Sequence, residues 1–142
     1  MAETRPLPKI TEQNRPFWEG TRSGELRAQR CLACGRLRAL PQDLCPHCLA
    51  EGGPWVALSG KGTLSSWCVY HRAFHPAFAD AVPYVIAQVD LAEGIRYIAP
   101  LRHGADAPLV LGLPVRVVYE SISDEVTLPL FEAERAGAQA LP

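Results

Sequence analysis

Short runs of alternating apolar and polar residues dominate the second half of the chain. The clearest run spans residues 83–91, where the odd-numbered apolar positions fall on one face, as in a half-buried strand. A tight turn at Glu93-Gly94 joins this run to the next as a hairpin. The other predicted strands lie at 63–72, 95–101, 115–119 and 126–131. Five short strands, with a large break between the third and the fourth, predict a small Greek-key barrel of the OB type.

The first 24 residues predict an extended arm and one helix. Two prolines restrict the backbone of residues 1–10 to an extended arm. Thr11 is placed as the N-cap of a helix that runs to about Ser23, where Gly24 stops it. Pro16 falls inside this span, so a kink or two short helical pieces is the alternative to a single helix.

Phe17 and Trp18 are the apolar residues of the predicted helix. A helix this short is not stable alone, so its aromatic rings must be buried against something. We expect them to anchor the helix on its own domain, and contact with a partner is the alternative.

Residues 25–58 predict a metal-bound ribbon. Weak strands at 25–30 and 36–40 flank a first knuckle, and 55–58 forms a closing strand after a Gly-Gly-Pro break. The cysteines occur as two CxxC pairs separated by ten residues: Cys31 and Cys34, then Cys45 and Cys48. Such spacing lets each pair turn both thiolates toward one ion, and together they supply a tetrahedral site.

Zinc is the metal that a four-thiolate tetrahedron suits best. An iron site of the rubredoxin kind has the same ligands, and two disulfides or a dithiol redox pair are the non-metal alternatives. With four protein ligands the site is closed, so its predicted role is structural.

Arginines cluster around the ribbon. Arg30 and Arg36 adjoin the ligands and are expected to offset the formal −2 charge of a zinc tetrathiolate. Arg27 and Arg38 are interpreted as freer to bind a ligand, such as a phosphate group.

Composition and charge narrow the classes of function. The 142 residues suffice for one domain, or for two very small ones that share a core. The formal net charge of −1 argues against non-specific nucleic-acid binding. No apolar run has transmembrane length, and the polar, proline-containing N-terminus does not have the pattern of a signal peptide. Reduced cysteines without an export signal predict a cytoplasmic protein.

Catalytic patterns are not found in the sequence. There is no nucleophile elbow, phosphate loop or paired-carboxylate motif. The fifth cysteine, Cys68, lies in mid-strand and is interpreted as a small buried apolar residue. Aromatic residues of the barrel half are candidates for stacking bases, for lining a groove or for the core.

An ordered set of motifs resembles the domain-of-unknown-function 35 family over about residues 12–131. The matching motifs are Pro16-Phe17-Trp18-Glu19-Gly20, Gly24-Glu25-Leu26, the two CxxC knuckles, Gly62-Thr63, His71-Arg72, Pro83-Tyr84-Val85, Glu93-Gly94, Gly112-Leu113-Pro114-Val115 and Leu128-Pro129-Leu130-Phe131. The resemblance implies a mainly β protein with an N-terminal helix, a rubredoxin-like zinc ribbon and an OB-fold. We place these at residues 1–24, 25–58 and 59–131, and expect a flexible tail or short helix at 132–142.

The same resemblance implies a function. Members of this family are acyl-CoA-associated, and several are small subunits of thiolase-superfamily enzymes in which the large partner carries the catalytic residues. We therefore expect a non-catalytic, zinc-binding subunit of a thiolase or retro-aldolase. A free-standing acyl-CoA binder and a single-stranded nucleic-acid-binding module are the alternatives. Candidate CoA contacts are Arg27, Arg38, Lys61 and Arg72, and candidate partner contacts are Phe17, Trp18, Phe74 and Phe78.

Overall fold

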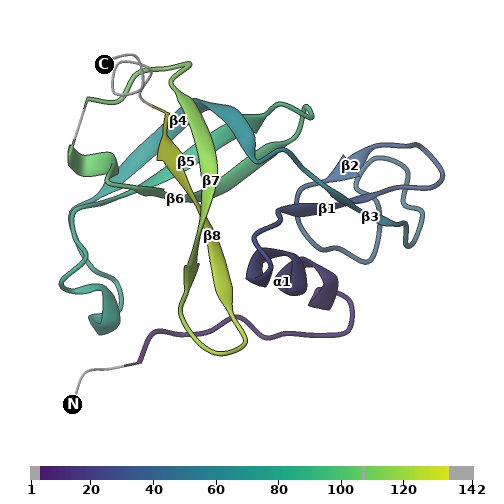
Figure 1. The fold of residues 1–142 in the computed structure, drawn as a ribbon, viewed down its shortest axis with the longest axis horizontal. Helices are drawn as coiled ribbons and strands as arrows, with labels where there is room; N and C mark the ends of the chain where they lie inside the picture. The colour runs from purple at the N-terminus through teal and green to yellow at the C-terminus, as the bar shows by residue number, and fades with distance from the viewer. Residues whose placement is uncertain (1–3, 107, 135–142) are drawn as a thin grey trace.

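The computed structural model describes residues 4–106 and 108–134, and it contains one α-helix, a small sheet and a barrel (Figure 1). The helix is α1 (Arg15–Arg22). The small sheet has the order β2-β1-β3, with β1 (Arg27–Arg30), β2 (Leu37–Arg38) and β3 (Trp55–Ala57). The barrel strands are β4 (Lys61–Tyr70), β5 (Tyr84–Leu91), β6 (Arg96–Arg102), β7 (Pro114–Ser121) and β8 (Thr127–Ala133). Two 3₁₀ turns, η1 (Pro76–Phe78) and η2 (Gly104–Asp106), lie in its loops.

The five barrel strands close in the order β4-β5-β6-β8-β7. The long strand β4 pairs with β5 over most of its length, and its first residues pair with β7. Only β6 and β8 run parallel, with Leu101 opposite Phe131. The predicted fold class is therefore confirmed: one helix, a zinc-ribbon region and a five-stranded OB barrel.

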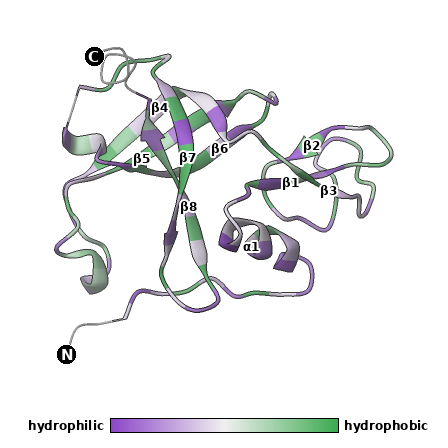
Figure 2. Cartoon of the chain, in the orientation of Figure 1, coloured by the Kyte–Doolittle hydropathy of each residue, from purple (hydrophilic) through white to green (hydrophobic). Residues whose placement is uncertain are grey.

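The alternation of apolar and polar residues along the strands corresponds to the residues that form the core. In β5 every second residue from Val85 to Leu91 is buried, and β6 buries Tyr97, Ala99 and Leu101 in the same way. Hydrophobic and hydrophilic bands follow the barrel strands in Figure 2. Phe17 and Leu26 belong to the same cluster as the barrel residues, so the helix, the ribbon and the barrel share a core.

The helix begins at Arg15, four residues after the predicted N-cap. Asn14 is the N-cap, and it exchanges hydrogen bonds with Thr11: each backbone N–H donates to the other's side-chain oxygen, at 2.7 and 3.3 Å. Pro16 therefore lies in the first turn, where its missing N–H has no intrahelical role, and it causes no kink. The single helix is therefore observed and the alternative of a kink is wrong, because the helix starts later than the sequence pattern suggested.

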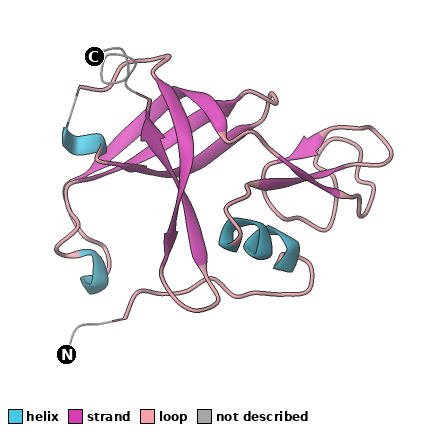
Figure 3. Ribbon diagram, in the orientation of Figure 1, coloured by secondary structure: helices cyan, strands magenta, loops and turns pink. Residues whose placement is uncertain are grey.

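The helix α1 packs against β1 and also against β7 and β8, and it lies between the small sheet and the ends of these two strands (Figure 3). The strand β8 continues to Ala133, two residues beyond the predicted end of the barrel. The remainder of the predicted tail, 135–142, lies outside the described residues. Within the described part of the chain, no helix has the length and apolar character needed to span a membrane.

Candidate metal centre

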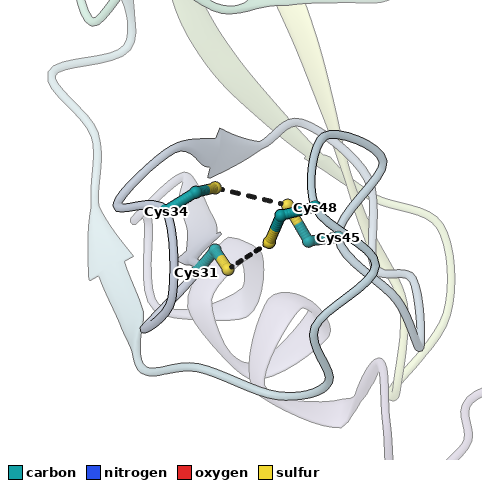
Figure 4. A group of neighbouring side chains, drawn as sticks. All are labelled: Cys31, Cys34, Cys45 and Cys48. Atoms are coloured by element: carbon teal, nitrogen blue, oxygen red, sulfur yellow. Dashed lines mark hydrogen bonds between the residues drawn. The ribbon is translucent and has the colours of Figure 1, made fainter.

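Two similar turns bring the four cysteines together. Cys31 directly follows β1, and the N–H of Gly35 donates to the carbonyl of Cys31 at 2.9 Å. In the second knuckle the N–H of Leu49 donates to the carbonyl of Cys45, also at 2.9 Å. Both turn-closing residues have a positive φ, 75° at Gly35 and 66° at Leu49. Each turn points its two thiols toward the other knuckle, as Figure 4 shows.

The sulfur positions fit a tetrahedral metal ion. All four Sγ atoms lie within 4.8 Å of one another, with 3.5 Å between Cys31 and Cys48 and 3.6 Å between Cys34 and Cys45 (Figure 4). Zn–S bonds of about 2.3 Å in a tetrahedron place the sulfurs about 3.8 Å apart. A disulfide needs about 2.05 Å. The geometry therefore favours the metal over the disulfide alternative.

Electrostatic repulsion between the four sulfurs also favours a bound cation. Backbone N–H groups, that of Cys34 foremost, lower the pKa of the Cys31 thiol to about 6. The N–H of Ala50 acts in the same direction on Cys48, but the Cys31 sulfur, burial of the thiol and the other two sulfurs outweigh it and raise the pKa of Cys48 to about 11. Thiolates this close repel one another, and a divalent ion removes the repulsion.

The four cysteines leave no open coordination position, so the site holds the ribbon together and offers no place for a substrate. Cys31 and Cys45 are buried, whereas Cys34 and Cys48 are exposed. His47 is not a fifth ligand, because its Nδ1 is paired with the Arg36 guanidinium at 2.9 Å. Arg30 donates to the carbonyl of Gly35 at 2.9 Å. Both arginines therefore lie beside the knuckles, in agreement with a charge-balancing role.

Arg38 is not free to bind a ligand, contrary to the interpretation from sequence. Its side chain is only 2% exposed. Its guanidinium donates to the carbonyls of Gln42 and Gly52, on either side of the second knuckle. A phosphate group could reach Arg38 only by displacing these bonds, so its role is to fasten the second knuckle to β2.

The other three candidate CoA contacts differ in their surroundings. Arg27 is partly buried and binds Glu25 at 2.6 Å and the carbonyl of Pro16 at 3.0 Å, which ties β1 to α1. Lys61 and Arg72 are exposed, on β4 and just after it. The structure does not bring these residues together with Arg38 into one phosphate site.

The four candidate partner residues also separate into two groups. Phe17 is buried in the core, and Trp18 is half-buried with its ring edge-on to Phe17 at 5.0 Å. The anchoring interpretation of Phe17 is thus correct, and direct contact with a partner is excluded for this side chain. Phe74 is exposed and Phe78 is half-buried, in the loop that follows β4.

Cys68 is exposed on the outside of β4, so the expectation of a buried thiol was wrong. The register irregularity between Leu64 and Ser66 shifts the strand, and the even-numbered positions after it face outward. The Cys68 sulfur beside the Tyr70 hydroxyl raises the pKa of Tyr70.

Two residues with a structural role were not predicted from the sequence. Leu49 occupies the left-handed position that Gly35 fills in the first knuckle, a difference visible when the two CxxC motifs are aligned. Glu93 accepts a hydrogen bond of 2.5 Å from the backbone N–H of Ser59, between the ribbon and the barrel. The two partners are 34 positions apart in the chain, so no local pattern in the sequence indicates this bond.

The fold and the site together define a structural zinc ribbon joined to an OB barrel. Residues 18–52 match the ChsH2 rubredoxin-like zinc ribbon domain, and residues 55–120 match the ChsH2 C-terminal OB-fold domain. The chain belongs to the DUF35 family of zinc-ribbon and OB-fold proteins, as the motifs predicted.

Relatives with curated names support this membership. A DUF35 domain-containing scaffold protein of Methanocaldococcus jannaschii is 30% identical over 68% of each chain. The probable enoyl-CoA hydratase alpha subunit of Thermomonospora curvata is 38% identical over 89% of this chain and 39% of its own length. The 3-oxo-4,17-pregnadiene-20-carboxyl-CoA hydratase alpha subunit of Mycobacterium tuberculosis is 37% identical over 82% of this chain. The chain spans less than two fifths of the length of these two hydratase subunits.

Solved structures agree with the fold. A chain of the Ltp2-ChsH2(DUF35) aldolase superposes with a TM-score of 0.76 at 36% identity, covering 89% of this chain and 98% of that one. A DUF35 protein of unknown function from Sulfolobus solfataricus has a TM-score of 0.59 at 13% identity, which supports the fold alone.

Proposed function

We propose that this chain is the non-catalytic, zinc-binding small subunit of a thiolase-superfamily acyl-CoA enzyme, of the thiolase or retro-aldolase type. Its work is to support a catalytic subunit that carries the reacting residues. The observation that carries the proposal is the match to nearly the whole length of one chain of a two-component aldolase, at 36% identity. A benzoylsuccinyl-CoA thiolase subunit, BbsA of Geobacter metallireducens, is 32% identical over 57% of this chain.

The chemistry of the described residues supports an accessory role. The one dense cluster of reactive groups is the cysteine set, and a closed tetrathiolate has no position for substrate. Two relatives are named as hydratase subunits, but most of their length has no counterpart in this chain. We therefore carry over the assembly with a CoA enzyme and not the hydratase reaction.

Contact with CoA is a further part of the proposal. Lys61 and Arg72 are exposed cations on the barrel, suited to charge-assisted bonds with the phosphates of CoA. Lys61→Ala should raise the KM of the assembled enzyme for its CoA substrate several-fold and leave kcat unchanged. An unchanged KM in Lys61→Ala, Arg72→Ala and the double variant would remove CoA contact from the proposal.

The test of the function is affinity capture from the cells that encode the chain, with zinc retained and the captured protein identified by mass spectrometry. We expect a stoichiometric thiolase-superfamily protein whose thiolytic or aldol-cleaving activity depends on this chain. A cytoplasmic complex is expected, and cell fractionation checks that location.

Two results would overturn the proposal. Recovery of the chain alone, together with CoA binding in calorimetry, would indicate a free-standing acyl-CoA binder. Nuclease-sensitive recovery of nucleic acid, with salt-dependent binding to oligonucleotides, would indicate a single-strand-binding module.

A further inference from the structure

The outer side of β4, β5 and β6 carries apolar residues where solvent-facing strands usually carry polar ones. Cross-strand partners point to the same side of a sheet, so the pairing defines which residues lie together. Cys68 is opposite Ile86, which is opposite Pro100, and Tyr70 is opposite Tyr84. We call these residues, with Ile98, the apolar sheet face: Cys68, Tyr70, Tyr84, Ile86, Ile98 and Pro100.

The apolar sheet face is uncharged. Ser66 and Gln88 are its neutral neighbours on β4 and β5, and at the Ile98 end the first charges are those of the Asp90–Arg96 pair, which is closed on itself at 2.8 Å. At the other end Arg102 follows Pro100 on the same side of β6, and Arg72 follows Tyr70. These two cations border the face and do not cover it, and the net charge of the chain is −1, so a polyanion is not the favoured occupant. The middle of the face suits an apolar protein surface.

At one end the face continues into an ordered aromatic anchor. Phe74 is 75% exposed, yet its ring is edge-on to Tyr70 at 6.2 Å and lies beneath the Arg72 guanidinium at 5.6 Å. Tyr70 is in turn stacked on Tyr84 at 5.0 Å. An exposed aromatic ring that is held in place before binding loses little conformational entropy in a complex, which is typical of interface hot spots.

At the other end the face continues into a groove between the barrel, the helix and the ribbon. Ile98 and Pro100 line this groove, which has a volume of about 450 Å³, opposite Trp18, Leu40 and Pro41. Ile98 is 65% exposed. An apolar surface thus extends from the ribbon loop, across three strands, to Phe74.

The sheet face by itself is smaller than a protein interface. One residue on one side of a sheet covers a strand spacing of about 4.8 Å by two rises of about 3.4 Å, so the six residues cover about 200 Å². A stable interface takes about 800 Å² from each partner, so the groove and the Phe74 loop must contribute most of the contact area.

We propose that the apolar sheet face, with Phe74 and the groove, is the surface on which the thiolase-like catalytic subunit docks. This inference rests on the proposed function, since it names the same partner. It adds the location: the outer side of β4–β6, and not the metal knuckles.

The fifth cysteine provides a direct footprint. With zinc bound to the other four, Cys68 is the only free thiol among the chain's 5 cysteines, and it is one of the six residues of the face, on β4. Alkylation of Cys68 by a maleimide, followed by intact mass, should slow at least tenfold in the complex. The matched control is Leu111→Cys on a Cys68→Ser background. Leu111 is 71% exposed in the turn before β7, and its labelling should not change.

Affinity supplies the second measurement, using the full zinc-loaded chain and the captured catalytic subunit. Ile98→Asp and Phe74→Ala should each weaken binding about tenfold or more. Leu111→Asp, a change of the same kind at an equally exposed site, should stay within twofold. Because Phe74 is exposed, Phe74→Ala tests the surface without risk to the fold.

The outcomes separate the two proposals. If the wild-type chain binds the subunit while Phe74→Ala and Ile98→Asp bind equally well, the docking surface is wrong and the proposed function stands. The same conclusion follows if Cys68 labels at the free rate in the complex. If the wild-type chain binds no such subunit, both proposals fail.

Discussion

At the scale of single residues, the two metal knuckles differ at one informative position. Gly35 and Leu49 close equivalent turns with φ of 75° and 66°. A left-handed backbone is unstrained for glycine but costs about 1–2 kcal/mol for a residue with a Cβ. Leu49 is 70% exposed, so burial of its side chain within this chain does not offset the strain.

We therefore predict that Leu49→Gly stabilises the zinc-bound chain by about 0.5–1 kcal/mol, measured by urea unfolding. Gly35→Ala should destabilise it by about 1 kcal/mol. A Cβ at Gly35 would contact nothing within 4 Å, so the whole effect would come from the backbone. A destabilising Leu49→Gly would show that the Leu49 side chain has a role in the fold.

The hydrogen bonds of Arg38 indicate that its role is to stabilise the second knuckle. Arg38→Ala removes a buried side chain and its two charge-assisted hydrogen bonds to the carbonyls of Gln42 and Gly52. The chain should lose about 2–3 kcal/mol of stability and release zinc to a chelator faster. Arg36→Ala, at an exposed neighbour, should change neither quantity by much. Normal stability with a raised KM for CoA would instead restore Arg38 as a ligand contact.

At the scale of elements, the hairpin between β5 and β6 is bonded to the linker between β3 and β4. Glu93 in the hairpin accepts a hydrogen bond from Ser59 in the linker. Burial raises the pKa of Glu93, but hydrogen bonds from Ser59 outweigh it, and the net pKa lies below the ordinary value for a glutamate. The stability from this bond is thus fully present above the unfolded pKa of about 4.3 and is lost as the pH falls through the lower folded pKa.

Glu93→Gln should therefore destabilise the chain at pH 7, by about 1 kcal/mol, because a neutral acceptor replaces a charged one. The difference from wild type should shrink as the pH falls from 7 to 3, because the Glu93 carboxylate is protonated as the pH passes through its lowered pKa. Urea unfolding at the two pH values measures it, with exposed Glu12→Gln as the control. An equal difference at both pH values would contradict the role of the charge.

At the scale of the whole molecule, the ribbon, the helix and the barrel fold as one unit because they share a core. Phe17 and Leu26 pack in the same cluster as Leu64, Val89 and Phe131. Phe17→Ala should destabilise the chain by about 3–4 kcal/mol and leave a single unfolding transition. Leu32→Ala, at an exposed leucine of the first knuckle, is the control. Separate transitions for ribbon and barrel would show that the core is not shared.

The sequence by itself determined the metal site, the five barrel strands and the family. These features depend on local spacing: two CxxC turns, period-two alternation and glycine-containing turns act within a few residues of one another. The four cysteines that the sequence pairs do lie together, and the buried face of β5 from Val85 to Leu91 was predicted correctly.

Only the tertiary structure decided which side chains are exposed and free to bind a ligand or a partner. Arg38 and Arg36 are both basic residues near the knuckles, yet Arg38 is buried between the carbonyls of Gln42 and Gly52, on either side of the second knuckle, and Arg36 is exposed. The irregularity in β4 moved Cys68 to the outside, and the pairing of β4 with β5 placed it opposite Ile86. Burial and availability depend on contacts between residues far apart in the chain, and neither spacing nor alternation encodes them.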